Sequence, residues 1–278
     1  MNRRKIALAL VLGVGGLSFA AHALFSFQVD AAGAKGLARA LIAHAGSEMG
    51  ISAEVQGKVT GLAELGIDQA APVLAGIYQN LSALDAGASG KEAEARFDDM
   101  NRAFLSLVDV KDRVVAEAGK SLSPRERATT IVKVGARFHE AHPSRDSNDA
   151  VLGSLRAAHQ ASLSAYLKLD AARSAKVFGA MDTFAAQRKG LRDERRAAFE
   201  LLETAVGANA SDAALATLLA GWDKVNAKAS DVTRAQIAEA SRQFTLAEKL
   251  ALVHRAKQHI DRALIIVALI GKFAPIRG

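Results

Sequence analysis

The stretch Leu122-Ser123-Pro124-Arg125-Glu126 holds the residue types that begin a helix, in the order that a helix start requires. The Ser123 hydroxyl can accept a hydrogen bond from a free backbone N–H of the first turn, and Glu126 can reach back to the N–H of Ser123. Pro124 suits the first helical position, where its missing N–H costs nothing. Leu122 can pack onto the first turn. The stretch therefore predicts a capping box that opens a helix.

The same pattern recurs 122 residues later, at Phe244-Thr245-Leu246-Ala247-Glu248. Two weaker helix starts, Ile51-Ser52 and Leu169-Asp170, are 118 residues apart. A near-constant offset indicates one unit of about 120 residues written twice. Each half also predicts the same order of helices: short, long, long, then a capped final helix. We therefore expect an all-α fold with long antiparallel α-hairpins, arranged as two tandem four-helix units over residues 24–145 and 146–278.

The composition agrees with an all-α protein. Half of the 278 residues are hydrophobic, aromatic residues make up 5%, and only four prolines interrupt the chain. Short β-branched runs argue against a β sandwich or an α/β sheet. The chain has no cysteine, which excludes disulfides, thiol redox chemistry, cysteine zinc sites and c-type haem attachment. The fold must therefore be held by core packing alone.

The N-terminus has the pattern of an export signal over residues 1–23. A basic segment at residues 3–5 precedes an apolar segment at residues 6–17, and Ala21-His22-Ala23 is a small-x-small cleavage site. An uncleaved anchor is the alternative, because low polarity continues to residue 27 and 22 residues can cross a bilayer. We expect cleavage before Leu24 and a periplasmic protein. Cleavage lowers the net charge from +7 to +4, which does not favour nucleic-acid binding.

Breaks between the expected helices are set by glycine, proline and polar residues. Gly66 and Pro72 predict a kink or break, after which Asp68 can cap a restarted helix. Gly119 is expected to end the helix before Leu122. The polar stretch from residue 142 to 149 is the expected boundary between the units. The apolar run over residues 263–270 is too short to span a membrane.

These features together resemble the Spy/CpxP family of periplasmic proteins, which includes the periplasmic heavy-metal sensors. The hallmark of that family is a twice-repeated Leu-Thr-x-x-Gln, which the stretches at 122–126 and 244–248 match with Glu in the last place. The weaker starts depart further, with Val55 and Arg173 where Gln belongs. The charged stretch over residues 187–196 is similar to the family's charged central helix. The resemblance implies thin, curved α-hairpins that dimerise into a client-binding cradle, here as two units fused in one chain.

A basic run lies in the second half of the chain, and it contains Arg188, Lys189, Arg192, Arg195 and Arg196. At helical spacing Arg188, Arg192 and Arg195 fall on one face. These side chains could line a concave surface that binds clients or anionic partners. The alternative is a solvated face with ion pairs between residues four apart.

His139 and His142 are three residues apart near a predicted helix end. That spacing can chelate a divalent metal if further ligands come from elsewhere, and a solvated pair is the alternative. We expect no other cofactor. Trp222 lies in an apolar stripe and is expected to pack in the core. No nucleophile elbow, phosphate loop or His-Glu-x-x-His motif occurs in the sequence, so we do not expect an enzyme.

Three functions remain open from the sequence. The first is an exported, ATP-independent binding protein of chaperone or envelope-stress type, which holds partly folded clients on apolar strips bordered by Arg and Lys. Its partners would be unfolded proteins or an envelope sensor protein, with transient membrane association possible. The second is a periplasmic sensor or buffer for zinc, nickel or copper. The third is a structural helical interaction module.

Overall fold

A computed structural model describes residues 31–141 and 149–258 and shows an all-α fold. The predicted signal peptide and the apolar run at residues 263–270 lie outside the described residues. Within them, no helix is long and apolar enough to cross a membrane. The helices of the two halves are α3 (Ala31–Glu48), α4 (Ala53–Asp85), α5 (Gly90–Ser121) and α6 (Pro124–Ala141), then α7 (Asp149–Leu167), α8 (Ala171–Gly207), α9 (Asp212–Gln243) and a helix over residues 246–258.

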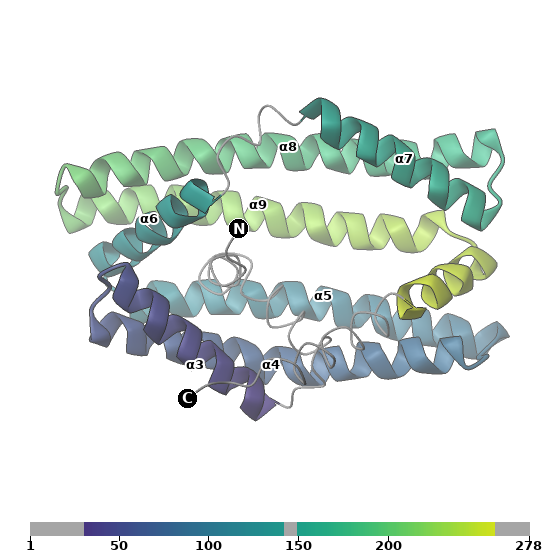
Figure 1. The fold of residues 1–278 in the computed structure, drawn as a ribbon, viewed down its shortest axis with the longest axis horizontal. Helices are drawn as coiled ribbons and strands as arrows, with labels where there is room; N and C mark the ends of the chain where they lie inside the picture. The colour runs from purple at the N-terminus through teal and green to yellow at the C-terminus, as the bar shows by residue number, and fades with distance from the viewer. Residues whose placement is uncertain (1–30, 142–148, 259–278) are drawn as a thin grey trace.

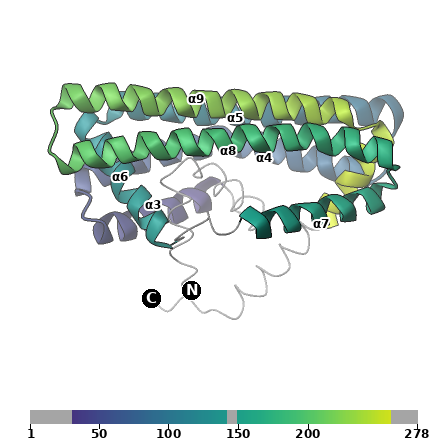
Figure 2. The same ribbon diagram turned by 90° about the horizontal axis from the view of Figure 1, so that it is seen from above.

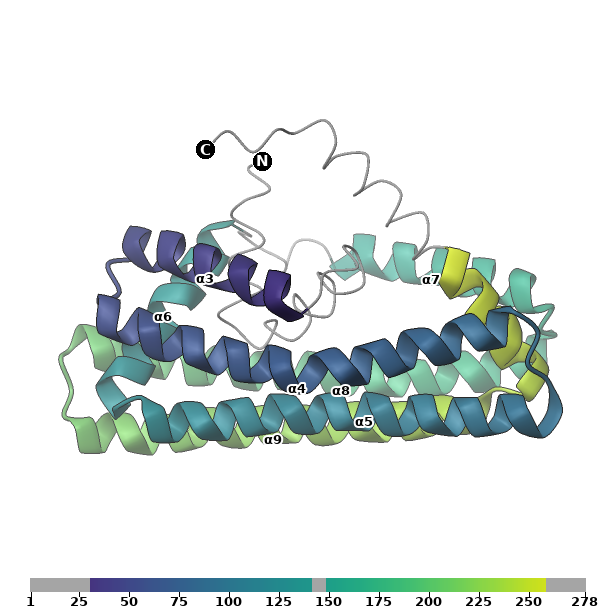
Figure 3. The ribbon, with the colours of Figure 1, turned by 90° about the horizontal axis from the view of Figure 1, so that it is seen from below.

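The four long helices lie side by side in a curved layer, in the order α8, α9, α5, α4 (Figure 1), with α8 and α4 displaced towards the short helices (Figure 3). Helix α4 packs against α5 and α8 against α9, and α5 meets α9 at the centre of the layer. The shorter helices α3, α6 and α7 and the 246–258 helix all lie on one face of this layer (Figure 2). The opposite face of the layer carries none of the described short helices.

Both stretches that the sequence singles out form complete capping boxes. The backbone N–H of Glu126 donates to the Ser123 hydroxyl at 3.2 Å, and the N–H of Ser123 donates to the Glu126 carboxylate at 2.7 Å. The second box repeats this geometry, at 3.3 Å and 2.7 Å, between Thr245 and Glu248. Leu122 and its counterpart Phe244 are both buried, so each box is fastened to the core by the residue before it.

Removing either cap should destabilise the chain. Ser123→Ala and Thr245→Ala are each expected to cost about 1 kcal/mol of unfolding free energy, because first-turn N–H groups lose their acceptor. Urea melts of the two variants measure this cost. Ser82→Ala, within α4, is the control with no cap to lose. Costs near zero at both caps would show that the helix starts do not depend on these hydroxyls.

Each capping glutamate also binds a cation from the second helix of its own half. Lys58 of α4 donates to Glu126 at 2.8 Å, and Arg173 of α8 donates to Glu248 at 2.8 Å. These hydrogen bonds lower the pKa of both carboxyl groups below their ordinary value of 4.5. A carboxyl group whose pKa is lowered on folding adds stability above its unfolded pKa, and this stability is lost as the pH falls through the folded pKa.

We therefore expect the urea midpoint to be constant above about pH 5.5 and to fall below pH 4.5 as the two glutamates gain protons. In the Glu126→Gln/Glu248→Gln variant, which keeps a hydrogen-bonding side chain, this acid-dependent part of the loss should be smaller. An acid limb of the same size in the variant would assign the pH dependence to other carboxylates.

Helix α4 corrects one expectation. It runs without a break from Ala53 to Asp85 with Pro72 inside it, so the predicted break and restart are wrong. Asp68 caps nothing and instead pairs with Lys35 of α3 at 2.6 Å. A proline inside a helix removes one backbone hydrogen bond, and a helix that is packed against other helices before and after the proline bends there instead of ending. Helix α4 is visibly bent in Figure 3. Likewise α5 continues past Gly119 to Ser121.

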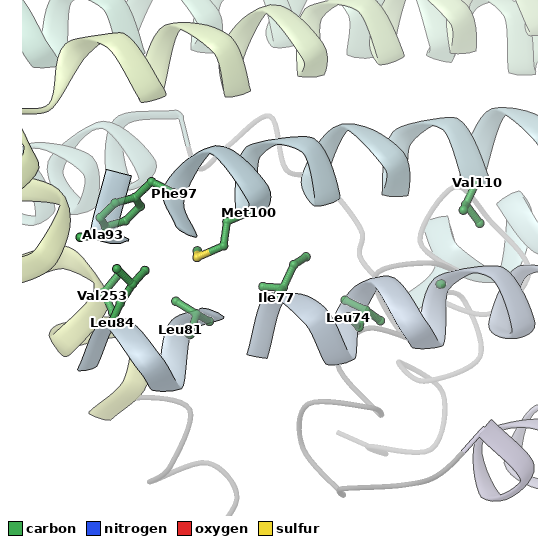
Figure 4. Close-up of a cluster of buried hydrophobic side chains, with 10 residues drawn as sticks. Leu74, Ile77, Leu81, Leu84, Ala93, Phe97, Met100, Val110 and Val253 are labelled. Carbon is green, nitrogen blue, oxygen red and sulfur yellow. The ribbon is translucent and has the colours of Figure 1, made fainter. Parts of the chain in front are cut away.

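The capped final helix of each half contacts its own half and also packs on the hairpin of the other half. Helix α6 contacts α8 and α9, and has few contacts with α5 of its own half. Its Ala128 lies in one buried cluster with Leu202 of α8 and Leu215 of α9. Reciprocally, Val253 of the 246–258 helix packs into the buried cluster of the α4–α5 hairpin (Figure 4).

A polar contact also joins each of these two final helices to the hairpin of the other half. Arg127 of α6 forms a two-pronged ion pair with Asp223 of α9, and His254 lies 2.8 Å from Asp85 at the end of α4. The two expected four-helix sets are therefore present in helix order but are not self-contained. The predicted boundary at residues 142–149 lies outside the described residues except for Asp149, which begins α7.

Candidate functional site

The two hairpins differ in the seam between their long helices. In the first hairpin a continuous row of apolar residues is buried, and α4 contributes Ala70, Leu74, Ile77, Leu81 and Leu84 (Figure 4). In α8 the buried residues lie towards its two ends, as Val177, Phe178, Phe199 and Leu202. The structure describes all of α8, and no residue between Phe178 and Phe199 is buried. The middle of the second hairpin therefore lacks an apolar seam along α8.

Arginines stand in α8 where α4 has buried apolar side chains. Counted from the first residue of each helix, Arg188, Arg192 and Arg195 correspond to Ala70, Leu74 and Ile77. Helix α8 is longer than α4, at 37 residues against 33, and it extends beyond the counterpart of the α4 end. These three arginines, called the basic row below, therefore stand at positions that are buried core positions in the first hairpin.

Arg188 and Arg192 are exposed and form no ion pair or hydrogen bond within the described part of the chain. Arg188 is about three helical turns from both Val177 and Phe199, so it lies on the face of α8 that they occupy. That face packs against α7 near Val177, where Leu163 joins the same cluster, and against α6 near Phe199. The two free arginines therefore lie on the short-helix face, between the ends that α7 and α6 cover.

Arg195 departs from the expectation of one exposed basic face, because its side chain turns into the α8–α9 seam. Its Nη2 donates to Oδ1 of Asn226 at 3.1 Å, and its Nε is covered and has no partner. Burial lowers the pKa of the guanidinium. An arginine whose Cβ lies on the inner side of a helix can be drawn in by one amide acceptor, which the spacing of α8 alone does not reveal.

A polar cluster continues from Arg195 across α9 to α5. Lys111 of α5 donates to the hydroxyl of Ser230, which in turn donates to Asp112 at 2.6 Å. Arg234 binds Asp112 at 2.7 Å and Asp109 at 2.8 Å. Partial burial is the largest single influence on Asp112 and raises its pKa, but the hydrogen bonds donated by Ser230 and Arg234 and the charges of Lys111 and Arg234 together lower the pKa below its ordinary value. The centre of the layer is therefore held by charged and hydroxyl groups.

Lys111 is, after Arg195, the second cation of this cluster whose pKa is lowered. Burial is the largest cause of the lowering, and the positive charges of Arg195 and Arg234 lower the pKa further. Asp112 opposes this effect from 3.4 Å. Lys111 and Arg195 are thus close enough to repel each other, although they come from helices at opposite sides of α9.

The remaining members of the predicted basic run are exposed on α8. Lys189 and Arg196 each interact with another group of the chain. Between them, Glu194 binds Lys228 of α9 at 2.6 Å. This part of the run has the ion-pairing expected of a solvated helix face.

The predicted histidine pair is not tested. His139 lies in α6 near its end, and His142 lies outside the described residues. Among the residues that are described, no group of three or more His, Asp or Glu side chains could hold a metal ion. Metal binding at His139 and His142 stays a prediction.

Sequence analysis missed Lys111, Asn226 and Ser230. A signal for Asn226 was present, since it follows Leu215, Leu219 and Trp222 at helical spacing and so falls on the apolar stripe of α9. A polar residue in an apolar stripe needs a partner on the facing helix. The polar residue in this apolar stripe therefore predicts a buried hydrogen bond at Asn226, but the stripe does not identify Arg195 as the donor.

Comparison of the chain with family models, with curated proteins and with solved structures finds no match. The resemblance to the Spy/CpxP family therefore stays a prediction from the capping stretches. The features that bear on function are the basic row, which consists of Arg188, Arg192 and Arg195, and the polar seam, which contains Asn226 and Ser230.

Proposed function

We propose that the protein is an exported, ATP-independent helical binding protein of chaperone or envelope-stress type, which holds partly folded clients through their acidic segments. The observation that supports this function is the pair of unpaired, exposed arginines, Arg188 and Arg192, at positions where the other hairpin has core residues. A folding role would favour apolar side chains there. Two uncompensated charges on a face bounded by α6 and α7 instead suit a negatively charged ligand.

The binding surface differs from the one expected from the sequence. Leu74 and Ile77, the apolar residues of the first hairpin, are only 3% and 1% exposed, so they do not form a strip for clients. Among the described residues the large exposed apolar side chains are Phe104, Tyr166 and Leu201, from three different helices. Capture would therefore depend on charge, which makes it rapid, reversible and sensitive to salt.

The test is suppression of aggregation of an acidic unfolded client. In Arg188→Gln/Arg192→Gln, two charge contacts of about 0.5–1 kcal/mol each are lost, so client affinity should fall about five- to thirtyfold at low salt. Thermal stability should stay close to that of the parent, because both side chains are exposed. Lys91→Gln/Lys224→Gln removes the same charge from exposed positions on α5 and α9 and should protect the client as the parent does.

Equal protection by the arginine variant and the parent would show that the basic row is a solvated face. If the parent itself protects no acidic client, the chaperone function is wrong.

A further inference from the structure

Arg195 is a partly buried cation without an anionic partner. Its only hydrogen bond within the described residues goes to the neutral amide of Asn226, while its Nε has no partner. Removing a guanidinium from water is costly unless a carboxylate and a full set of hydrogen bonds compensate it. Of the five N–H donors of this arginine, one binds Asn226 and the Nε–H is buried without a partner among the described residues.

Other partly buried arginines of this chain do have carboxylate partners. Arg127 binds Asp223, Arg173 binds Glu248 at 2.8 Å, and Arg234 binds Asp112 at 2.7 Å. Each of these pairs joins two helices of different parts of the fold. Arg195 also lies between two helices, but no Asp or Glu side chain of the described residues binds it.

A second cation lies nearby. Lys111 approaches the same seam from α5, and its pKa is lowered mainly by burial and further by the charge of Arg195. Its hydrogen bond goes to Ser230, one helical turn from Asn226 on the same side of α9. Asp112 lies 3.4 Å from Lys111 and also binds Arg234, which has further partners in Asp109 and Asp231, whereas no carboxylate of the described residues binds Arg195. An added anion would relieve the repulsion between Arg195 and Lys111.

We infer that the seam beside Asn226 is a carboxylate-binding site, in which Arg195 donates hydrogen bonds to an Asp or Glu side chain of the client and Lys111 supplies a second positive charge. Arg192, less than one turn before Arg195 and exposed, marks the side from which the carboxylate enters. The inference rests on the proposed function and specifies it. Arg188 and Arg192 attract an acidic segment, and Arg195 fixes one carboxylate of that segment.

Titration of the full chain with hexaglutamate, followed by calorimetry at low salt, tests this site. Arg195→Met keeps the length of the side chain but not its charge or donors, and it should bind the peptide at least tenfold more weakly than the parent. Arg195→Lys keeps the charge without the planar fork, so its loss should be smaller but measurable. Lys111→Met should lose affinity by about three- to tenfold. Lys91→Met, on an exposed part of α5, is the control and should bind as the parent does.

Acetate and inorganic phosphate are titrated in parallel to separate a client carboxylate from a free anion. Hexaglutamate should bind tighter than either, and only its affinity should depend on both Arg192 and Arg195. Unchanged hexaglutamate binding by Arg195→Met overturns the inference, and so does phosphate binding as tight as that of the peptide.

The outcomes separate this inference from the proposed function. Protection of clients that depends on Arg188 and Arg192 but not on Arg195 retains the proposed function and overturns the carboxylate site. Hexaglutamate binding that depends on Arg195, in a parent protein that protects no client, supports the site and removes the chaperone function.

Discussion

Replacement of Arg195 by isoleucine together with Asn226 by leucine should stabilise the free chain by about 1–3 kcal/mol, because buried charged and polar groups cost more than apolar groups of similar volume. The first hairpin already contains the apolar arrangement, with Ile77 at the position that corresponds to Arg195. Both residues must change together. Arg195→Ile alone would leave the Asn226 amide buried without its donor, which costs part of the gain.

Thermal and urea melts of the double variant measure this effect. The opposite exchange, Ile77→Arg in the first hairpin, is the matched control and should be strongly destabilising, since Ile77 is 1% exposed and belongs to a buried cluster of apolar residues. The stabilised variant should also lose hexaglutamate binding, as expected when a site is built at the expense of stability. A double variant that is less stable than the parent would show that the polar seam stabilises the hairpin.

The close contact between α6 and α8 gives the second large effect. A Cβ added at Gly135 of α6 would lie 2.0 Å from Cε2 of Phe199, which is itself buried. Gly135→Ala is therefore expected to cost about 1–3 kcal/mol, because either α6 or the phenyl ring has to move. Gly179→Ala in α8 is the control: a Cβ there meets nothing within 4 Å, so the change should stabilise the chain by about 0.4–1 kcal/mol.

A second substitution identifies the cause. In Gly135→Ala/Phe199→Leu the added methyl group has room, so the cost should be less than the sum of the two single costs. Strict additivity in urea melts would mean that α6 does not press on Phe199.

The parts of this fold that sequence predicts are those fixed by near neighbours. Ser123 and Glu126 are three residues apart, and their mutual hydrogen bonds need no knowledge of the rest of the chain. The same holds for Thr245 and for the Ser52 cap of α4. The sequence left open whether Pro72 kinks or breaks the helix; α4 is continuous and bent (Figure 3), an outcome that depends on the helices packed around it.

The packing of each capped final helix on the hairpin of the other half could not be predicted from the hydrophobic periodicity of the sequence. The apolar stripe of α6 shows which face is buried but does not name the hairpin that covers it. The choice is made by particular long-range contacts, such as Arg127 with Asp223 and Gly135 against Phe199. Arg195 is a similar case, because its direction depends on Asn226, a residue of another helix.

The packing of each capped final helix on the hairpin of the other half sets an order in time for a chain that is synthesised from its N-terminus. Leu84 and Phe97 of the first hairpin form a cluster that Val253 completes, and Asp85 meets His254 across 169 residues of chain. The first hairpin is therefore synthesised with apolar surface that no part of the chain made up to that point covers as Val253 does. Closing contacts of such long range makes the last step of folding slow and leaves an interval in which that surface can aggregate. The N-terminal half of this chain is accordingly itself exposed to aggregation until residues 246–258 have been synthesised.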